Sequence, residues 1–387
     1  MMVAALLIVL AGVGVTALLL GLVCVVVHVR RSPSLPSRRP GISILKPLCG
    51  ADDELALNLE RFATIEYPRF ELLLGVRDRS DPAWPVAVAA ARRHPRRVRV
   101  VLQRGVVGMN PKVNQLATLE REAKYDLLLV SDSNTRPPSG YLSELAALFE
   151  DPWVACATSP VSGAGHETFG ALLDNLHLAS AIGPGQIAAR LLAGRDLVVG
   201  KSMALRRSAL EALGGFAAFG DHLAEDYVIG RRITQELRLG VALARLPVLN
   251  VATRRTVQSF VDRYARWAVI HRTAVSLPTS LAQALLNPWP LTLVALALCP
   301  VPLVGWVSLA TLVVKIALDV TTARALGFRG ARFAPLAVPF KDLVLFIAWC
   351  IALFRRTVEW RGSRLRVGPG SKLVPIISEV PATEGRS

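Results

Sequence analysis

The chain has 387 residues and a net charge of +16, and 52% of its residues are hydrophobic. This length leaves room for a sizeable soluble core together with membrane segments. Because aromatic residues are few and no nucleic-acid-binding motif is present, the positive charge favours an anionic membrane surface over a nucleic acid. The five cysteines have no CxxC spacing, which argues against a disulfide framework or a zinc site and is typical of a reducing cytoplasm.

The amino-terminal segment, residues 1–29, is predicted to be a transmembrane anchor. Residues 1–27 contain no charged side chain, and about 20 apolar residues suffice to span a bilayer as a helix. The run is longer than the apolar part of a signal peptide, has no preceding Lys or Arg, and is not followed by a small-residue cleavage site, so we expect it to be retained. A basic Pro/Ser linker follows over residues 30–40, and its arginines place the next domain in the cytoplasm.

Residues 41–255 alternate between strand and helix patterns. Strand patterns cover 42–45, 71–76, 98–102 and 154–157, and helical patterns cover 52–64, 82–93, 111–123, 141–149 and 168–179. A further buried strand is the apolar run that opens the stretch 126–134. Alternation of this kind predicts an α/β fold in which helices cover both faces of a mostly parallel sheet.

The second half of this domain is less regular. We expect Gly183-Pro184-Gly185 to break the chain, residues 197–202 to form a strand or buried loop, and residues 207–213 and 223–239 to form helices. The sequence Gly200-Lys201-Ser202 does not predict a nucleotide triphosphate loop, because such a loop needs its first glycine five residues before Gly200, where Arg195 stands.

The carboxy-terminal part is predicted to return to the membrane. Residues 256–276 contain a basic amphipathic helix, and residues 277–355 contain apolar segments at 281–299 and 301–318 that are each near spanning length. A third segment, 343–354, has only twelve residues once Lys341 and Asp342 are excluded, so we expect it to be re-entrant or interfacial. The basic tail, residues 356–387, then stays in the cytoplasm.

Three acidic residues stand at the ends of predicted elements. Asp78 follows the strand 71–76, Asp132 follows the apolar run of 126–134, and Asp226 opens a helix. Ligands of open α/β sheets bind at the carboxyl ends of the strands, so these acids are candidates for a site. Each one alone also fits a structural role, in a turn for Asp78 and Asp132 and at a helix N-terminus for Asp226.

With the downstream segment Arg263-x-x-Arg266-Trp267, these acids resemble the D, D, D, (Q/R)xxRW signature of membrane-bound family 2-like glycosyltransferases. Longer matches are similar to the ceramide glucosyltransferases of family 21 in particular, and the similarity spans about residues 40–367. These matches are Ile44-Leu45-Lys46-Pro47-Leu48, Val76-Arg77-Asp78, Gly108-Met109-Asn110-Pro111-Lys112-Val113-Asn114, Ala224-Glu225-Asp226-Tyr227 and Trp360-Arg361-Gly362-Ser363-Arg364-Leu365-Arg366.

The resemblance implies a GT-A catalytic domain, which is Rossmann-like with a mostly parallel sheet, between N-terminal and C-terminal transmembrane helices. It also implies a UDP-sugar donor, a divalent metal (Mg or Mn) and an inverting transfer to a lipid hydroxyl. The expected reaction moves glucose from UDP-glucose to the primary hydroxyl of ceramide at the cytoplasmic membrane face. In this chain Asn134 stands where many such enzymes have a second acid of the metal site.

Inverting transfer needs a base for the acceptor hydroxyl and positive charge for the departing diphosphate. We expect Asp226 to be the base, Asp132 to hold the metal, and Asp78 to accept hydrogen bonds from the uridine or ribose.

The remaining candidates for donor binding are cationic or aromatic. We expect Lys112 and Arg266 to bind the phosphates, Trp267 to lie beside the sugar or the acceptor, and Arg263 to take part in donor binding. The two arginines also fit contact with lipid headgroups by an interfacial helix.

Two other functions stay open. One is transfer of N-acetylglucosamine or another sugar to a different lipid, such as a hopanoid. The other is a non-catalytic membrane protein that binds a lipid or a nucleotide sugar. A processive polysaccharide synthase is disfavoured, because two or so C-terminal segments leave little material for a polymer channel.

Overall fold

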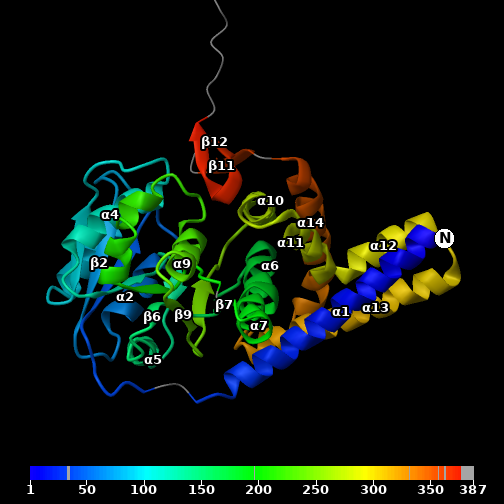
Figure 1. Cartoon of the computed structure of the whole chain (residues 1–387), viewed down its shortest axis with the longest axis horizontal. Helices are drawn as coiled ribbons and strands as arrows, with labels where there is room; N and C mark the ends of the chain where they lie inside the picture. The colour runs from blue at the N-terminus through cyan, green and yellow to red at the C-terminus, as the bar shows by residue number, and fades with distance from the viewer. Residues whose placement is uncertain (33–34, 196, 331, 356, 361–362, 376–387) are drawn as a thin grey trace, which may run out of the picture.

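The structure is a computed structural model that describes residues 1–32, 35–195, 197–330, 332–355, 357–360 and 363–375. Residues 33–34 of the linker, Arg361 and Gly362 of the tail motif, and residues 376–387 of the predicted basic tail lie outside the described residues. A body built on a sheet carries a group of helices that project to one side, and the amino terminus lies at the far tip of this group (Figure 1).

A seven-stranded sheet runs through the body in the order β3-β2-β1-β4-β8-β6-β9. Strand β1 is parallel to β2 and β4, and β2 is parallel to β3. Strand β8 is antiparallel to both β4 and β6, and β6 is parallel to β9. The prediction of a mostly parallel α/β sheet is therefore confirmed. The strand bounds are β1 Ile42–Pro47, β2 Phe70–Val76, β3 Val98–Leu102, β4 Leu127–Val130, β6 Val154–Thr158, β8 Met203–Arg206 and β9 Gly240–Leu243.

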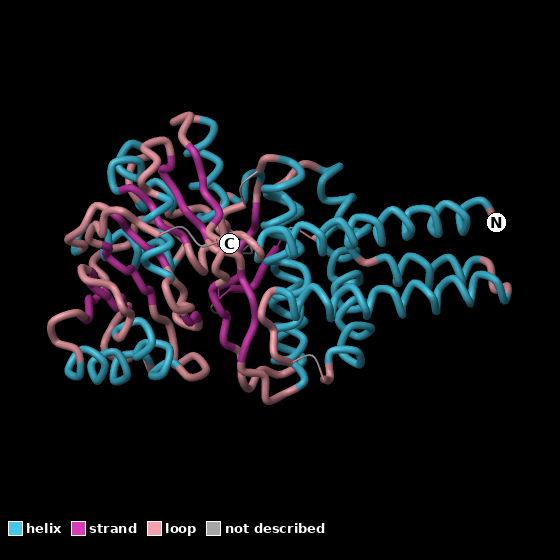
Figure 2. Tube along the Cα trace, turned by 90° about the horizontal axis from the view of Figure 1, so that it is seen from below, coloured by secondary structure: helices cyan, strands magenta, loops and turns pink. Residues whose placement is uncertain are grey.

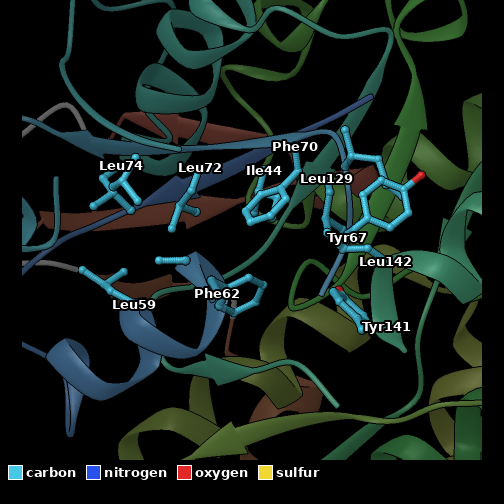
Figure 3. Close-up of a cluster of buried hydrophobic side chains, with 14 of the residues drawn as sticks. Ile44, Leu59, Phe62, Tyr67, Phe70, Leu72, Leu74, Leu129, Tyr141 and Leu142 are labelled. Atoms are coloured by element: carbon cyan, nitrogen blue, oxygen red, sulfur yellow. The ribbon is translucent and has the colours of Figure 1, made fainter. Parts of the chain in front are cut away.

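Helices cover both faces of this sheet. On one face Ile44 and Leu72 meet Phe62 of α2 (Figure 3), and on the other face Leu45 and Leu73 pack with residues of α4. Successive side chains of a strand point to opposite faces, so strands buried on both sides read as continuous apolar runs. The covering helices are α2 Leu55–Ala63, α3 Ala83–Arg93, α4 Pro111–Glu122, α5 Tyr141–Leu148, α8 Arg207–Ala212 and α9 Glu225–Gln235.

Two small sheets, which the sequence patterns did not predict, complete the body. In the first, β10 (Val248–Val251) is antiparallel to β5 (Thr135–Arg136) and parallel to β7 (Val161–Ala164). The second is formed by the antiparallel strands β11 (Thr357–Trp360), β12 (Ser363–Val367) and β13 (Leu373–Pro375), and it contacts helix α10 (Val257–Ala274).

Among the residues that the structure describes, three helices are each long and apolar enough to cross a membrane: α1 (Met2–Val29), α13 (Pro302–Ala325) and α14 (Ala334–Phe354). Helices α1, α12 (Pro288–Leu298) and α13 lie side by side and project from the body (Figures 1 and 2). Helix α14 stays against the body, where it contacts α10 and α6 (Phe169–His177). Membrane helices at both ends of the chain were predicted, and their apolar character supports an integral membrane protein.

The expected chain break at Gly183-Pro184-Gly185 is wrong. Helix α6 continues through a π-helical turn, η1 (Leu178–Ile182), directly into α7 (Gly183–Ala193). Pro184 has no N–H to donate, and the π-helical turn directly before it departs from the regular α-helical hydrogen-bond pattern that a proline would interrupt. A Cβ atom on Gly183 would lie 2.2 Å from the carbonyl oxygen of Val161, so the glycine serves close packing here.

The structure adds two features to the predicted carboxy-terminal segments. The segment 281–299 is bent, because α11 (Leu277–Ala282) and η3 (Gln283–Leu286) meet α12 at an angle of 83°, as in a broken span or a re-entrant loop. The segment 343–354 is not limited to twelve residues, because α14 runs on through the charged pair Lys341 and Asp342 to a length of 21 residues. The helix tolerates these charges because Lys341 Nζ lies 2.9 Å from Asp319 Oδ2 and Asp342 Oδ2 lies 3.3 Å from Lys315 Nζ.

Candidate active site

Four elements meet near the carboxyl end of β4. Asp132 follows this strand by two residues, and Lys112 lies in the first turn of α4. The loop before β8 brings Gly200 and Lys201, and Asp226 lies in the first turn of α9. The predicted residues Asp132, Lys112 and Asp226 therefore come together near the carboxyl edge of the sheet, the edge at which open α/β sheets bind their ligands.

Asp132 is held between two lysines, one on each carboxylate oxygen. Lys112 Nζ lies 3.1 Å from Oδ1, and Lys201 Nζ lies 3.2 Å from Oδ2. Burial acts to raise the pKa of Asp132, but the two ammonium groups outweigh it and hold the pKa well below its usual range. Asp132 is therefore an anion at physiological pH.

A third lysine, Lys46 on the buried strand β1, supports the backbone of the same turn. Its Nζ donates to the carbonyl oxygen of Asp132 at 2.5 Å and to Thr135 Oγ1 at 3.1 Å, and it lies 3.9 Å from the ring centroid of Phe62. Burial lowers the pKa of Lys46 to about 7, although the charge of Asp132 acts in the opposite direction. Lys46 fixes the backbone that carries Asp132.

Asn110 joins the starts of helices α4 and α9. Its Oδ1 accepts from the backbone N–H groups of Lys112 and Val113, at 2.9 and 3.2 Å, which caps α4. Its Nδ2 donates to Glu225 Oε2 at 3.2 Å, and Glu225 Oε1 lies 2.8 Å from Lys112 Nζ. The Asn-Pro-Lys and Glu-Asp-Tyr segments are therefore one structural unit that directs Lys112 toward Asp132.

Asp226 is a half-buried carboxylate with two backbone donors. Gly200 N–H donates to Oδ2 at 2.5 Å, and Tyr227 N–H donates to Oδ1 at 2.7 Å. Burial and then the neighbouring charge of Glu225 raise the pKa of Asp226 to about 6, against the opposing effect of Lys112. A carboxyl pKa raised toward neutral suits a general base that works at neutral pH.

Asp78 stands after β2 and is more exposed. Its carboxylate bonds to neighbours in sequence, accepting from Ser80 N–H at 3.0 Å and from Arg77 Nε at 2.8 Å. The bonds from Ser80 and Arg77 lower its pKa to about 2. Because β2 is separated from β4 by β1, Asp78 lies along the same edge of the sheet as Asp132, two strands away.

Arg263 and Trp267 lie on α10 beside α6. Arg263 Nη1 is paired with the fully buried Asp174 at 2.7 Å, and its guanidinium lies 5.2 Å from the ring centroid of Trp267. Tyr264 Oη also donates to Asp174, at 2.8 Å. Burial acts to lower the pKa of Arg263, but the charge of Asp174 together with other nearby acidic groups outweighs it and raises the pKa. Arg266, one turn further on, is partly exposed.

The residues around Asp132 do not fit a divalent metal ion in this arrangement. Both carboxylate oxygens are in ion pairs with lysines, and Asn134 Oδ1 accepts from Lys201 Nζ at 3.3 Å. In the part of the chain that the structure describes, no three His, Cys, Asp or Glu side chains are grouped so that they could hold a metal. Mg²⁺ and Mn²⁺ favour several oxygen ligands, and the oxygens of Asp132 and Asn134 are already bonded to lysines. Metal binding by Asp132 therefore remains a prediction.

The sequence patterns missed Lys201, Lys46 and Glu225 as parts of this site. Two of them carried a recognisable signal. Lys46 is a charged residue inside an apolar strand, and such a charge is buried only with partners. Lys201 stands in a Gly-Lys-Ser sequence that was considered only as a phosphate loop.

A family model described as glycosyl transferase family 21 matches residues 6–373. The chain belongs to this family. Two relatives of this family 21 chain are ceramide glucosyltransferases of Caenorhabditis elegans. Ceramide glucosyltransferase 3 is 28% identical over 351 residues, which are 88% of this chain and 75% of that protein. Ceramide glucosyltransferase 1 is 34% identical over 235 residues, 59% of this chain and 49% of that protein.

A solved structure supports the fold of this family 21 chain. A mannosyltransferase from Pyrobaculum calidifontis, in complex with GDP-Man and Mn2+, matches with a TM-score of 0.52 and 21% identity. The match covers 91% of this chain and 99% of that one. The chain is therefore a glycosyltransferase with the predicted GT-A fold.

Proposed function

We propose that this family 21 chain transfers glucose from UDP-glucose to the primary hydroxyl of ceramide, with inversion, at the cytoplasmic face of the membrane. One observation carries the proposal. A Cβ on Gly200 would lie 2.7 Å from Lys112 Nζ and 3.0 Å from Asp226 Oδ2, so an ammonium group and a half-buried carboxylate flank the same point. A base therefore stands next to the positive charge that a departing diphosphate requires.

In the proposed step, the acceptor hydroxyl oxygen forms a bond to the anomeric carbon of the sugar. The bond from that carbon to the β-phosphate oxygen breaks, and its electron pair leaves with UDP. The hydroxyl proton passes to Asp226, whose pKa of about 6 leaves it deprotonated at neutral pH. Lys112 stabilises the negative charge that develops on the diphosphate. A single displacement inverts the anomeric centre.

The other predicted residues have places in the same proposal. Asp78, on the edge of the sheet where Asp132 lies, accepts hydrogen bonds from the uridine or ribose. Arg266 contacts the donor phosphates, and Trp267 lies beside the sugar or the acceptor. Arg263 acts on the donor through its charge and holds Trp267 in place, since its guanidinium is already paired with Asp174.

A divalent metal ion, Mg or Mn, enters this proposal only through Asp132. When bound, such an ion would neutralise diphosphate charge. The Mn2+ in the mannosyltransferase structure supports a metal in this fold. Asp132 is free to bind an ion here only if a lysine first leaves one of its oxygens.

A lipid acceptor at the membrane is supported by two observations. The relatives described above are ceramide glucosyltransferases, and α10 contacts α14, one of the helices that can cross a membrane. The cytoplasmic orientation rests on Arg30 and Arg31, which follow α1 at the end that reaches the body.

The substrate assignment is tested by a panel of donors and acceptors. Purified membranes containing the full chain are incubated with UDP-glucose, UDP-galactose or UDP-N-acetylglucosamine against ceramide, diacylglycerol or a hopanoid, and the products are identified by mass. We expect glucosylceramide as the main product. An N-acetylglucosaminyl hopanoid instead would favour the alternative acceptor, and no product from any pair would favour the non-catalytic alternative.

A further inference from the structure

Lys201 is buried and rigidly mounted beside Asp132. Its side chain is 6% exposed, and the loop that carries it is fixed on both sides. Before it, Gly200 N–H bonds to Asp226. After it, the carbonyl oxygen of Ser202 accepts from Thr158 Oγ1 at 2.8 Å, and Ser202 Oγ lies 2.6 Å from Tyr141 Oη. The ammonium group of Lys201 therefore has a defined position.

That position lies between Asp132 and Asn134. Lys201 Nζ is 3.2 Å from Asp132 Oδ2 and 3.3 Å from Asn134 Oδ1. These residues are the first and third of the Asp132-Ser133-Asn134 segment, where a D-x-D sequence would offer two carboxylates to a cation. The ammonium group of Lys201 thus already bridges these two side chains.

A chain of amides fixes the oxygen of Asn134 toward this lysine. Asn175 Nδ2 donates to the carbonyl oxygens of Ala164 and Ala252, both at 2.8 Å, so its Oδ1 is left for Asn250 Nδ2, at 3.5 Å. The Oδ1 of Asn250 then accepts from Asn134 Nδ2 at 3.1 Å. Only an oxygen of Asn134 remains to face Lys201. The side-chain amide of Asn134 is therefore oriented to accept a hydrogen bond from the Lys201 ammonium group.

We propose that Lys201 supplies, from within the chain, the positive charge that a divalent metal ion would otherwise bring to Asp132 and Asn134. Two ammonium groups, Lys112 and Lys201, already occupy both oxygens of one carboxylate, so a metal ion can reach Asp132 only by displacing one of them. Lys201 and Lys112 together then stabilise the electron pair that leaves with UDP. This inference rests on the proposed transfer from a UDP-sugar.

The experiment compares Lys201→Met with the wild-type chain, both full length in detergent or nanodiscs. Transfer from UDP-glucose to ceramide is measured after EDTA treatment and again with Mn²⁺, and Mn²⁺ binding is measured separately by electron paramagnetic resonance. We expect the wild type to change by less than about twofold with EDTA and to bind no Mn²⁺ at Asp132. The Lys201→Met variant should lose about 100-fold in EDTA, the effect of removing one preorganised donor, and should bind Mn²⁺ and recover activity with it.

Two controls separate charge from side-chain loss. Lys201→Arg keeps the charge and should stay resistant to EDTA, whereas Lys124→Met makes the same replacement at the end of α4 away from the site and should behave as wild type. The proposal is overturned if wild type needs Mn²⁺ and binds it while Lys201→Met responds in the same way. If Lys201→Met does not fold, Mn²⁺ binding by the wild type tests the proposal: no binding supports it, and binding overturns it. If no transfer occurs with or without Mn²⁺, the proposed function fails, and the Mn²⁺ binding measurement still decides the role of Lys201.

Discussion

Gly200 N–H donates to Asp226 Oδ2 at 2.5 Å, so the loop before β8 is bonded directly to the first turn of α9. This bond places the carboxylate that we assign as the base. It also puts Gly200 next to Lys112, with no room for a side chain between them. Loop, helix and lysine therefore act as one unit in positioning the base.

Substitution Gly200→Ala should lower kcat by about 100-fold, because displacing a catalytic group by about 1 Å costs this much. The added Cβ would lie 2.7 Å from Lys112 Nζ and 3.0 Å from Asp226 Oδ2, so one of them must move. The control is Gly185→Ala, where nothing lies within 4 Å of the new atom. Equal activity in both variants would contradict the assigned geometry.

The rate of transfer should depend on the ionisation of Asp226. Its pKa is raised to about 6, so the base is protonated and inactive below this value and deprotonated above it. We expect kcat to rise about tenfold per pH unit below pH 6 and to level off above it. A pH series of single-turnover rates measures this. A flat profile between pH 5 and 8 would exclude Asp226 as the titrating base.

The two arginines of the RxxRW segment should differ in what they support. Arg263→Gln leaves the buried Asp174 without its main partner, and we expect it to destabilise the fold by about 3 kcal/mol. Arg266→Gln should leave thermal stability near wild type and raise the KM for UDP-glucose about tenfold. Thermal unfolding and donor saturation curves separate the two effects. The opposite pattern would reverse the roles of the two side chains.

A buried group of two lysines and two aspartates joins α13 to α14. Lys315 lies 2.6 Å from Asp319, and Lys341 lies 2.7 Å from Asp342 and 2.9 Å from Asp319. Lys341→Met should destabilise the protein by about 3–5 kcal/mol, because it leaves an uncompensated buried charge. The double variant Lys341→Met with Asp342→Leu should recover most of this loss, since the pair Lys315 and Asp319 remains. Unfolding temperatures in detergent test this, and a double variant as unstable as the single one would refute it.

Much of the fold could be predicted because the central strands are buried on both faces. The runs that contain Ile44, Leu72 and Leu128 are mostly apolar, and helical patterns lie between them. The short strands β5, β7 and β10 could not be predicted in this way. They have two to four residues each, too few to show a period, and their pairing depends on contacts distant in sequence.

The site was only partly predictable for a similar reason. Asp132 follows the end of a strand, and Lys112 and Asp226 lie at the starts of helices; sequence patterns locate both kinds of position. Lys201 reaches Asp132 across 69 residues of sequence, and no local pattern reports such a contact. In the same way, the pairing of Lys341 with Asp319 is what allows α14 to continue past the point where the isolated sequence suggested an end.

The most direct test of the central claim compares wild type with Asp226→Asn in purified, full-length form, with UDP-glucose and ceramide in nanodiscs. An amide keeps the shape of the side chain but cannot take the proton of the acceptor hydroxyl. We expect the wild type to produce glucosylceramide and the variant to be slower by at least about 100-fold, with UDP binding retained. Unchanged turnover in Asp226→Asn would contradict the account of this residue as the base.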